Sequence, residues 1–445
     1  MPDRATLPEI ETQRRRSLPG VFASIPVSRS PQFWRRALAF AGPGFLISVG
    51  YMDPGNWATD LAAGSRFGYT LLFAVMASNL LAILLQTLAV KLGVAAEIDL
   101  AQACRQQYGR RTNFILWIFA EVAIAACDLA EVIGSAIALQ LLFGIPLLAG
   151  VLITGLDVLL ILALQRRGFR WLEAFVIVLI ATISVLFALE IAFSHPHWPS
   201  IGYHLFVPSR AMLLDPAMLY IAISILGATV MPHNLYLHSS IVQSRDYPRT
   251  PAGKREAIRM GSLDATIALT MALFVNAAIL VVAAAVFHHS GYTQVAEIGD
   301  AYKLLTPLLG VAGASTMFAV ALLASGQNST LTGTLAGQVV MEGFLDLRLP
   351  GWQRRLITRG LAILPTIIVV ALWGERGTAN LLLLSQVILS MQLSFAVFPL
   401  VAFTGNRRMM GEFANGAALR YLAWTAAFFI AGLNLWLLIQ LIPHH

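Results

Sequence analysis

Charged residues and cysteines are both scarce in this sequence. Asp, Glu, Lys and Arg together make up 12% of the 445 residues, about half the share that a soluble domain carries. Apolar residues make up 58%, which excludes a soluble multidomain protein and indicates that lipid surrounds most of the chain. The two cysteines, Cys104 and Cys127, are too few for a disulfide framework. We expect Cys104 in a loop and Cys127 inside a helix, with no bond between them.

The first 36 residues are polar and rich in arginine. They lack the short apolar core and the small-residue cleavage site of a secretory signal. We therefore predict a cytoplasmic tail that has no regular structure up to about Pro31.

Long apolar stretches follow this tail. A transmembrane helix needs about 20 consecutive, mostly apolar residues. Stretches of this length predict an all-α membrane protein with about eleven transmembrane helices. Their approximate spans are 38–66, 69–94, 113–142, 146–165, 169–194, 217–243, 261–288, 309–343, 355–374, 378–404 and 418–442.

The basic residues provide an independent test of this topology. If the N-terminus is cytoplasmic and the helices alternate, all but four of the 30 Lys and Arg residues fall on the cytoplasmic side. The exceptions are Arg66, Arg210, Lys303 and Arg376. This distribution follows the positive-inside rule and places the C-terminus outside. Because the positive charge is dispersed over several short segments, it indicates topology and not a nucleic-acid partner.

Two of the predicted helices carry a helix-breaking motif near their middle. The motifs are DPGN at 53–56 and MPHN at 231–234. Proline removes an amide donor and clashes with the preceding turn, which frees backbone groups at membrane depth. Such groups are tolerated only where they are buried in protein or line a cavity. Simple kinks in packed helices are the alternative, but the polar side chains in both motifs favour a binding site.

The two motifs align without a gap and share their Pro and Asn residues. They lie five predicted helices apart, and because five is odd, the second set of five helices starts on the opposite side of the membrane. We therefore predict a 5+5 inverted repeat with broken helices 1 and 6 and a site between the halves. The predicted divisions are a tail (1–36), a first repeat (37–204), a second repeat (205–405) and a loop with helix 11 (406–445).

The side chains at the two breaks predict a cation site. Asp53 offers a carboxylate, Asn56 an amide oxygen and Met231 a thioether, while the carbonyls of Gly50 and Ala228 lose their helical partners where each helix unwinds. Oxygen ligands alone suit magnesium and calcium, whereas one sulfur shifts the preference toward softer metals. Manganese, ferrous iron and cadmium fit this mixed set. Met231 as a packing residue is the alternative interpretation.

The helix predicted at 113–142 carries three acidic residues at membrane depth. Glu121 and Asp128 differ by about 20° around a helix, and Glu131 lies about 60° further round. The three form a stripe that must face the bundle interior. Ion pairing with arginines at the start of helix 9 and a proton route are both open and mutually compatible interpretations. The arginines are Arg354, Arg355 and Arg359.

Three further polar residues lie near the breaks. His233 is in the second break, where it would titrate near neutral pH, whereas His238 faces another side of the helix and is expected to pack in the core. Gln386 lies in an apolar run and is expected to face the central cavity. An unpaired Asp53 away from water should hold its proton until a bound cation drives it off, which would couple metal to protons.

At these residues the chain resembles the Nramp (natural resistance-associated macrophage protein) family of proton-coupled divalent-metal transporters. The carrying motifs are DPGN at 53–56 and MPHNLYLHS at 231–239. Supporting stretches are CDLAEVIGSAIALQLLFGIPLL from Cys127, GQNSTLTGTLAGQVVMEGF from Gly326 and RRLITRG from Arg354.

The resemblance implies the fold of the sodium-coupled amino-acid transporters and a secondary transporter, not an enzyme. The implied activity is uptake of manganese or ferrous iron with protons, without a cofactor. The implied metal ligands are Asp53, Asn56, Met231, Gly50, Ala228 and, in some states, Gln386. The implied proton pathway includes His233, Asp128, Glu131 and Glu121. Gly50 stands where the family often has alanine, a departure that should not matter for a backbone ligand.

Other classes are weaker interpretations of the same sequence. A transporter of this architecture for an amino acid is disfavoured by the carboxylate of Asp53. A non-transporting membrane sensor usually carries a large soluble extension, and an intramembrane metalloenzyme would need a motif such as HExxH, which is not found. With eleven helices the chain is expected to be of the bacterial form, to lie in the inner membrane and to function as a monomer.

Overall fold

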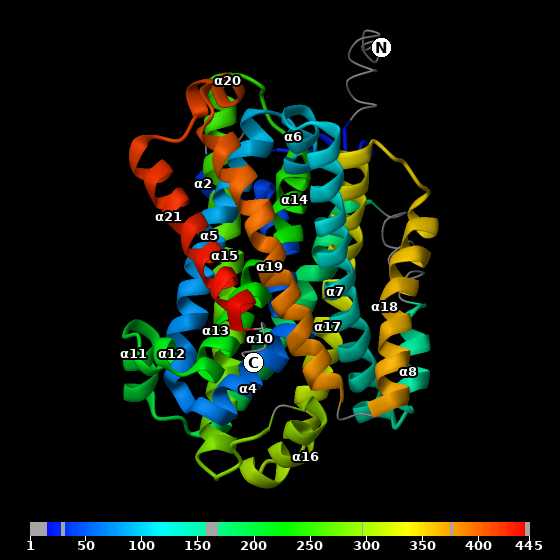
Figure 1. Ribbon diagram of the computed structural model, residues 1–445, viewed down its shortest axis with the longest axis vertical. Coiled ribbons are helices and arrows are strands. Elements are labelled where there is room, and N and C mark those ends of the chain that lie inside the picture. Colours follow the sequence, from blue (N-terminus) through cyan, green and yellow to red (C-terminus); the bar gives the residue numbers. More distant parts are fainter. Residues whose placement is uncertain (1–15, 28–31, 157–167, 296, 374–376, 441–445) are drawn as a thin grey trace.

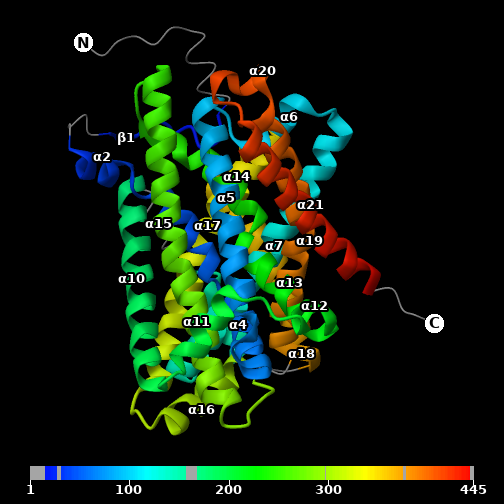
Figure 2. The same cartoon turned by 90° about the vertical axis from the view of Figure 1, so that its left-hand side faces the viewer.

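The protein forms an elongated bundle of helices in the computed structural model (Figures 1 and 2). The structure describes residues 16–27, 32–156, 168–295, 297–373 and 377–440. Most of the long helices run along the long axis of the bundle, as expected for a membrane-spanning protein.

The first half of the chain contains the first broken helix, which is interrupted at Asp53. Its elements in chain order are β1 (Ile25–Pro26), α2 (Phe33–Phe40), α3 (Pro43–Ser48), the 3-10 helix η1 (Gly50–Met52), α4 (Pro54–Phe67), η2 (Gly68–Leu71), α5 (Leu72–Ala95), α6 (Leu100–Gln107), α7 (Arg110–Phe143), α8 (Leu147–Thr154) and α10 (Phe169–Ser194).

The second half contains the other broken helix, formed by α13 and α14. Its elements are α11 (Trp198–Phe206), α12 (Ala211–Leu214), α13 (Pro216–Val230), α14 (Pro232–Ile241), η3 (Val242–Ser244), β2 (Arg245–Asp246), α15 (Pro251–Ala283), the π-helical turn η4 (Ala284–His288), α16 (Ile298–Leu309), α17 (Ala314–Leu345), α18 (Gly351–Trp373), α19 (Thr378–Gly405), α20 (Arg407–Met410), η6 (Gly411–Phe413) and α21 (Ala417–Gln440).

The predicted all-α membrane class is confirmed. Within the described ranges, seven helical segments are long and apolar enough to cross a membrane: Pro54–Ala95, Arg110–Phe143, Phe169–Ser194, Pro216–Ser244, Pro251–His288, Thr378–Gly405 and Ala417–Gln440. The count of eleven stays a prediction. Part of the predicted span 146–165 lies outside the described residues, which end at 156 and resume at 168.

Glycines interrupt two of the predicted helical spans. The span 38–66 has an additional break at Gly42, whose φ of 143° no helix accommodates. The span 309–343 begins later, at Ala314, because Gly310 and Gly313 have φ angles of 65° and 90° and separate α16 from α17. Positive φ is inexpensive for glycine alone, so these positions interrupt otherwise apolar stretches.

The prediction of an unstructured tail is also wrong over residues 16–27. Strand β1 pairs in parallel with β2, and Ala23 N–H donates to the Gln243 carbonyl at 3.0 Å. Leu18 and Ile25 are buried in this contact. Burial of these two apolar side chains and pairing of their backbone offset the entropy lost by ordering the segment.

The start of the first broken helix is held by α15 and α10. The backbone N–H groups of Gly42 and Gly44 donate to the carboxylate of Asp264, at 2.6 Å for Gly44. A Cβ atom on Gly42 would lie 2.4 Å from the Glu173 carboxylate, so only glycine fits. Glu173 in turn pairs at 2.8 Å with the fully buried Arg245. This network fixes where α3 enters the bundle.

Helices α6 and α20, which carry Arg105, Arg407 and Arg408, lie at one end of the bundle, and the predicted orientation in the membrane stays a prediction. In Figures 1 and 2, α6 and α20 lie at the end from which the N-terminal segment leaves, and α11, α12 and α16 lie toward the other end. Ion pairs join distant segments there: Lys254–Glu97 (2.7 Å), Arg255–Glu412 (3.4 Å) and Arg105–Asp346 (3.7 Å). Burial alone would raise the pKa of Glu97, but the hydrogen bond and charge of Lys254 outweigh it and lower that pKa.

Candidate functional site

At both helix breaks, which lie at the centre of the bundle, a proline begins the second half of the broken helix. Helix α4 begins at Pro54 after the N-cap residue Asp53, and α14 begins at Pro232 after Met231. In both helices proline occupies the first turn, where its missing N–H has no helical partner to lose. The aligned prolines therefore have the same place at both breaks, whereas the aligned residues before them differ, since Asp53 is extended and caps its helix and Met231 has a φ of +30° and no capping bond.

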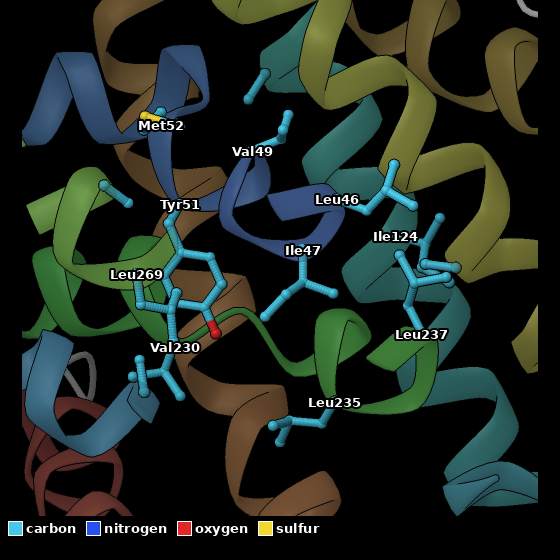
Figure 3. Close-up of a cluster of buried hydrophobic side chains, with 14 of the residues drawn as sticks. Leu46, Ile47, Val49, Tyr51, Met52, Ile124, Val230, Leu235, Leu237 and Leu269 are labelled. Carbon is cyan, nitrogen blue, oxygen red and sulfur yellow. The ribbon is translucent and has the colours of Figure 1, made fainter. Parts of the chain in front are cut away.

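Apolar side chains pack closely around the two breaks. Figure 3 shows Leu46 and Ile47 from the first broken helix near Leu235 and Leu237 from the second, together with Ile124 of α7. All five are buried in the same hydrophobic cluster. The polar groups at the breaks therefore lie in a low-dielectric environment, where charges and dipoles interact strongly.

Three oxygen atoms from the two breaks converge on one amide group. The Nδ2 atom of Asn56 donates to Asp53 Oδ1 at 2.7 Å, to the Ala228 carbonyl at 3.0 Å and to the Gly50 carbonyl at 3.4 Å. The first and third oxygens belong to the first broken helix and the second to the other. Of the six predicted metal ligands, the structure thus brings four together: Asp53, Asn56, Gly50 and Ala228.

Asp53 is more than a helix cap. Its Oδ1 atom accepts from the Asn56 backbone N–H at 2.7 Å, which is an ordinary capping bond. Its Oδ2 atom is buried and, within the described ranges, has no hydrogen-bond partner. A buried carboxylate oxygen without a partner is costly, which makes this atom an exception among the buried polar groups of the bundle.

Met231 lies next to the same group of atoms in a strained conformation. Its φ angle is +30°, a region that costs a non-glycine residue about 1–3 kcal/mol and that is typical of functional sites. Its sulfur lies close to Gly50, because a Cβ atom built on that glycine would be 3.1 Å from Sδ. Asn234 Nδ2 contacts the sulfur at 3.8 Å. The thioether is therefore the fifth predicted ligand at the breaks.

Gln386 on α19 lies against the first break but is not directed at the converging oxygens. It packs directly on Gly55, where no side-chain atom would fit. Its Nε2 atom donates to Ser385 Oγ at 2.9 Å, and its Oε1 atom is buried without a partner in the described part of the chain. The structure therefore places Gln386 beside Asn56 without joining it to the other predicted ligands.

That glycine in place of alanine at position 50 does not matter for a backbone ligand stays a prediction, but the position has a consequence for packing. A Cβ atom there would lie 2.5 Å from Asn234 Nδ2, which is held by the Ile47 carbonyl at 3.3 Å and by the Met231 sulfur. Alanine at position 50 would therefore have to displace the Asn234 amide. Glycine at position 50 therefore matters for packing against Asn234. Its backbone carbonyl would be present with any other residue.

We expect Gly50→Ala to destabilise the protein by about 1–3 kcal/mol, the usual cost of overpacking a well-packed interior. A thermal unfolding assay on purified protein measures the effect. The double variant Gly50→Ala/Asn234→Ala should recover most of the loss, because the clashing amide is removed. Gly432→Ala is the matched control, since nothing lies within 4 Å of its Cβ position. Equal stability of Gly50→Ala and wild type would contradict the close contact.

The acidic stripe on α7 was predicted to face the bundle interior. Two of its three members do so. Asp128 and Glu131 are buried, and both lie against Gly333 of α17. Glu131 Oε1 accepts from Ser329 Oγ at 2.7 Å. Glu121 is only partly buried and accepts from Trp117 Nε1 at 3.0 Å. The side chains of the predicted partners Arg354, Arg355 and Arg359 lie outside the described residues, so the pairing stays a prediction.

The two histidines of α14 have different surroundings. His233 is buried, and within the described ranges neither ring nitrogen has a hydrogen-bond partner. His238 Nδ1 lies 3.0 Å from Gln86 Oε1, and Gln86 Nε2 donates to the Tyr51 hydroxyl at 2.7 Å. The expectation that His238 packs in the core is confirmed.

The sequence did not identify Asn276 as a contact of the candidate site, and it gave Asn234 of the second motif no particular partner. Asn276 of α15 donates to the Tyr51 carbonyl at 2.8 Å and to Asn56 Oδ1 at 3.3 Å. Asn234 contacts the Met231 sulfur. The sequence does indicate that Asn276 has a polar partner, because an amide in the apolar stretch FVNAAILVV would otherwise be unsatisfied. Cys104 and Cys127 are both free and buried, which confirms that they form no disulfide.

The fold and the site define a multi-pass membrane transporter, not an enzyme, in which two broken helices meet at the centre of the bundle. The chain belongs to the Nramp family: the family described as natural resistance-associated macrophage protein-like matches residues 44–440. This agrees with the resemblance seen in its motifs.

Relatives and solved structures support this assignment. The chain is 62% identical over 430 residues to the divalent metal cation transporter MntH of Nostoc sp., covering 96% of this chain and 97% of the relative. It is 62% identical over 423 residues to the MntH of Bradyrhizobium diazoefficiens, covering 95% and 94%. The crystal structure of the Eremococcus coleocola manganese transporter superimposes with a TM-score of 0.88 at 43% identity, covering 94% and 90%.

A more distant structure shares the fold alone. Mhp1, a transporter of the nucleobase-cation-symport-1 family, superimposes with a TM-score of 0.56 at 15% identity, covering 89% of this chain and 91% of Mhp1. The architecture predicted from the paired breaks is therefore confirmed in a second group of transporters.

Proposed function

We propose that this protein is a proton-coupled secondary transporter that imports divalent transition-metal ions into the cytosol. Manganese and ferrous iron are the proposed substrates, with cadmium also accepted. The observation that carries the proposal is the convergence of Asp53 Oδ1 and the Gly50 and Ala228 carbonyls on one point, with the Met231 sulfur alongside. The names of the MntH relatives and of the Eremococcus coleocola manganese transporter support a divalent metal as substrate.

Each proposed ligand has a distinct part in binding. The Asp53 carboxylate supplies the negative charge, and the two carbonyls supply neutral oxygens at negative helix-dipole ends. Asn56 supplies an amide oxygen, and Met231 supplies the soft sulfur that favours transition metals over calcium and magnesium. Gln386 is proposed to join this set only after α19 or its side chain moves, since it now packs on Gly55.

Protons are proposed to move through the ionisable groups on both sides of the site. Asp53 has a buried oxygen without a partner in the described part of the chain, and a bound cation would drive a proton from such a carboxyl. His233 lies in the second break, and Asp128, Glu131 and Glu121 continue along α7. We propose that the proton route continues to the start of α18, at Arg354, Arg355 and Arg359.

The proposed orientation follows from the charged loops. The end of the bundle that carries α6 and α20 also carries the ion-paired basic segments, which supports a cytoplasmic position for it by the positive-inside rule. We propose the inner membrane of a bacterium, with a cytoplasmic N-terminus, an external C-terminus and a functional monomer. The repeats 37–204 and 205–405 would then move against each other around the site.

Transport by purified protein in proteoliposomes tests the proposal. Manganese uptake is measured with an inward proton gradient while a pH-sensitive dye reports the interior. Metal entry accompanied by acidification is expected. Metal entry without acidification would remove the proton coupling, and no entry of manganese, ferrous iron or cadmium would overturn the proposed substrate class.

Substitutions in the proton pathway should change the pH dependence of uptake more than metal binding. We expect His233→Ala and Glu131→Gln each to flatten the pH profile of manganese uptake between about pH 5 and 8, the range in which histidine changes charge. Manganese affinity at fixed pH should change less. The control is His204→Ala, because His204 lies on α11 and bonds only within that helix among the described residues. Unchanged proton flux in both variants would favour a structural role for these groups.

A further inference from the structure

Asn276 contacts both sides of the first break from a different helix. Its Nδ2 group donates to the Tyr51 carbonyl at 2.8 Å and to Asn56 Oδ1 at 3.3 Å. The residue is buried in α15, a helix that also holds the start of α3 through Asp264. Asn276 is thus placed to control the orientation of Asn56.

The present orientation of Asn56 directs the wrong end of its amide toward the site. Its NH₂ group donates to Asp53 Oδ1 and to the Ala228 and Gly50 carbonyls, so it takes the position that a cation bound to these oxygens requires. An amide NH₂ is a donor and cannot ligate a metal, whereas the amide oxygen can. Binding of a cation therefore requires the Asn56 amide to turn and present Oδ1.

Turning the amide leaves its NH₂ group on the side of Asn276. There it needs an acceptor, because a buried N–H group without one is costly. Asn276 Oδ1 is buried and has no hydrogen-bond partner in the described part of the chain. It belongs to the same amide whose Nδ2 group now donates to Asn56, so a turn of the Asn276 side chain would present it to the Asn56 NH₂ group.

We propose that Asn276 is a positioning residue that stabilises the metal-binding orientation of Asn56. In the present orientation Asn276 donates to Asn56 Oδ1; in the turned orientation its own Oδ1 accepts from Asn56 Nδ2. The exchange gives Asn56 a partner on the Asn276 side in both states, while the bound cation takes over the three oxygens to which the Asn56 NH₂ group now donates. This inference rests on the proposed metal site and adds a residue that does not touch the metal.

A double-mutant cycle separates this role from a purely structural one. Manganese binding to the purified full-length protein is measured by titration calorimetry for wild type, Asn276→Leu, Asn56→Ala and the double variant. We expect Asn276→Leu to weaken binding about tenfold, the scale of one unsatisfied buried group. In the Asn56→Ala background the same substitution should have little further effect, since no amide is left to orient.

The control variant has a similar amide far along another helix. Asn113 of α7 is buried, donates to the Phe344 carbonyl at 2.9 Å and has an Oδ1 atom without a partner in the described part. Asn113→Leu should leave manganese affinity unchanged. If Asn276→Leu does not fold, Asn276→Ala removes the same amide with less bulk, and the same non-additive result is expected.

The outcomes distinguish this inference from the proposed function. Equal losses from Asn276→Leu in both backgrounds would overturn the inference, because support of the Tyr51 carbonyl alone predicts additive effects. Failure of wild type to bind manganese would instead overturn the proposed metal site.

Discussion

Replacing Asp53 by alanine is expected to abolish manganese uptake into proteoliposomes. Asp53 is the one charged group among the proposed ligands, and the site is buried. A pair of unit charges 4 Å apart is worth about 4 kcal/mol at an effective dielectric constant of 20, which corresponds to roughly a thousandfold weaker binding. The loss should appear in metal entry and in the accompanying acidification together.

Asp215→Ala is the matched control for this variant. Asp215 also caps a helix that begins with proline, and it accepts from the N–H groups of Ala217 and Met218. Loss of such a cap costs about 0.5–2 kcal/mol of stability but should leave uptake intact. If both variants lost uptake to the same extent, capping and not metal binding would explain the requirement for Asp53.

Met231→Leu is expected to reduce the preference for cadmium and manganese over calcium. Leucine keeps a similar apolar volume and removes the sulfur, which is the one soft ligand proposed. We expect the ratio of manganese to calcium affinity to fall on the order of tenfold, or about 1.4 kcal/mol, with a larger fall for cadmium. Competition of each ion with manganese uptake measures these ratios.

Met231→Ala separates the sulfur from the packing of the side chain. Met231 packs with Ala123, Cys127 and Leu389, so alanine removes both sulfur and packing, whereas leucine removes mainly the sulfur. The two variants should therefore share the loss of selectivity and differ in stability. A leucine variant with the selectivity of wild type would show that the sulfur is not a ligand.

The breaks could be predicted because their signals are local. Proline in an apolar helix identifies Pro54 and Pro232, and their offset of five helices, an odd number, predicts the inverted repeat. The carbonyls of Gly50 and Ala228 followed from the position of each break. The chemistry of a few residues and the number of predicted helices were enough for these predictions, and the structure confirms the predicted transporter fold.

Other features depend on contacts between distant segments. Asn234 leaves no room for a Cβ atom at Gly50, and Asn276 bonds to the first break. Both contacts arise where separate helices meet. The order of residues 16–27 depends on pairing with β2, more than 200 positions away. A polar residue in an apolar helix predicts that a partner exists, but the sequence alone does not identify that partner.

Anomalous diffraction from crystals soaked with manganese would test the central claim most directly. We expect one strong peak at the manganese edge, surrounded by an Asp53 carboxylate oxygen, the Gly50 and Ala228 carbonyls and the Met231 sulfur. The amide oxygen of Asn56 should be turned toward this peak. A peak between Asp128 and Glu131 on α7, with none at the two breaks, would contradict it.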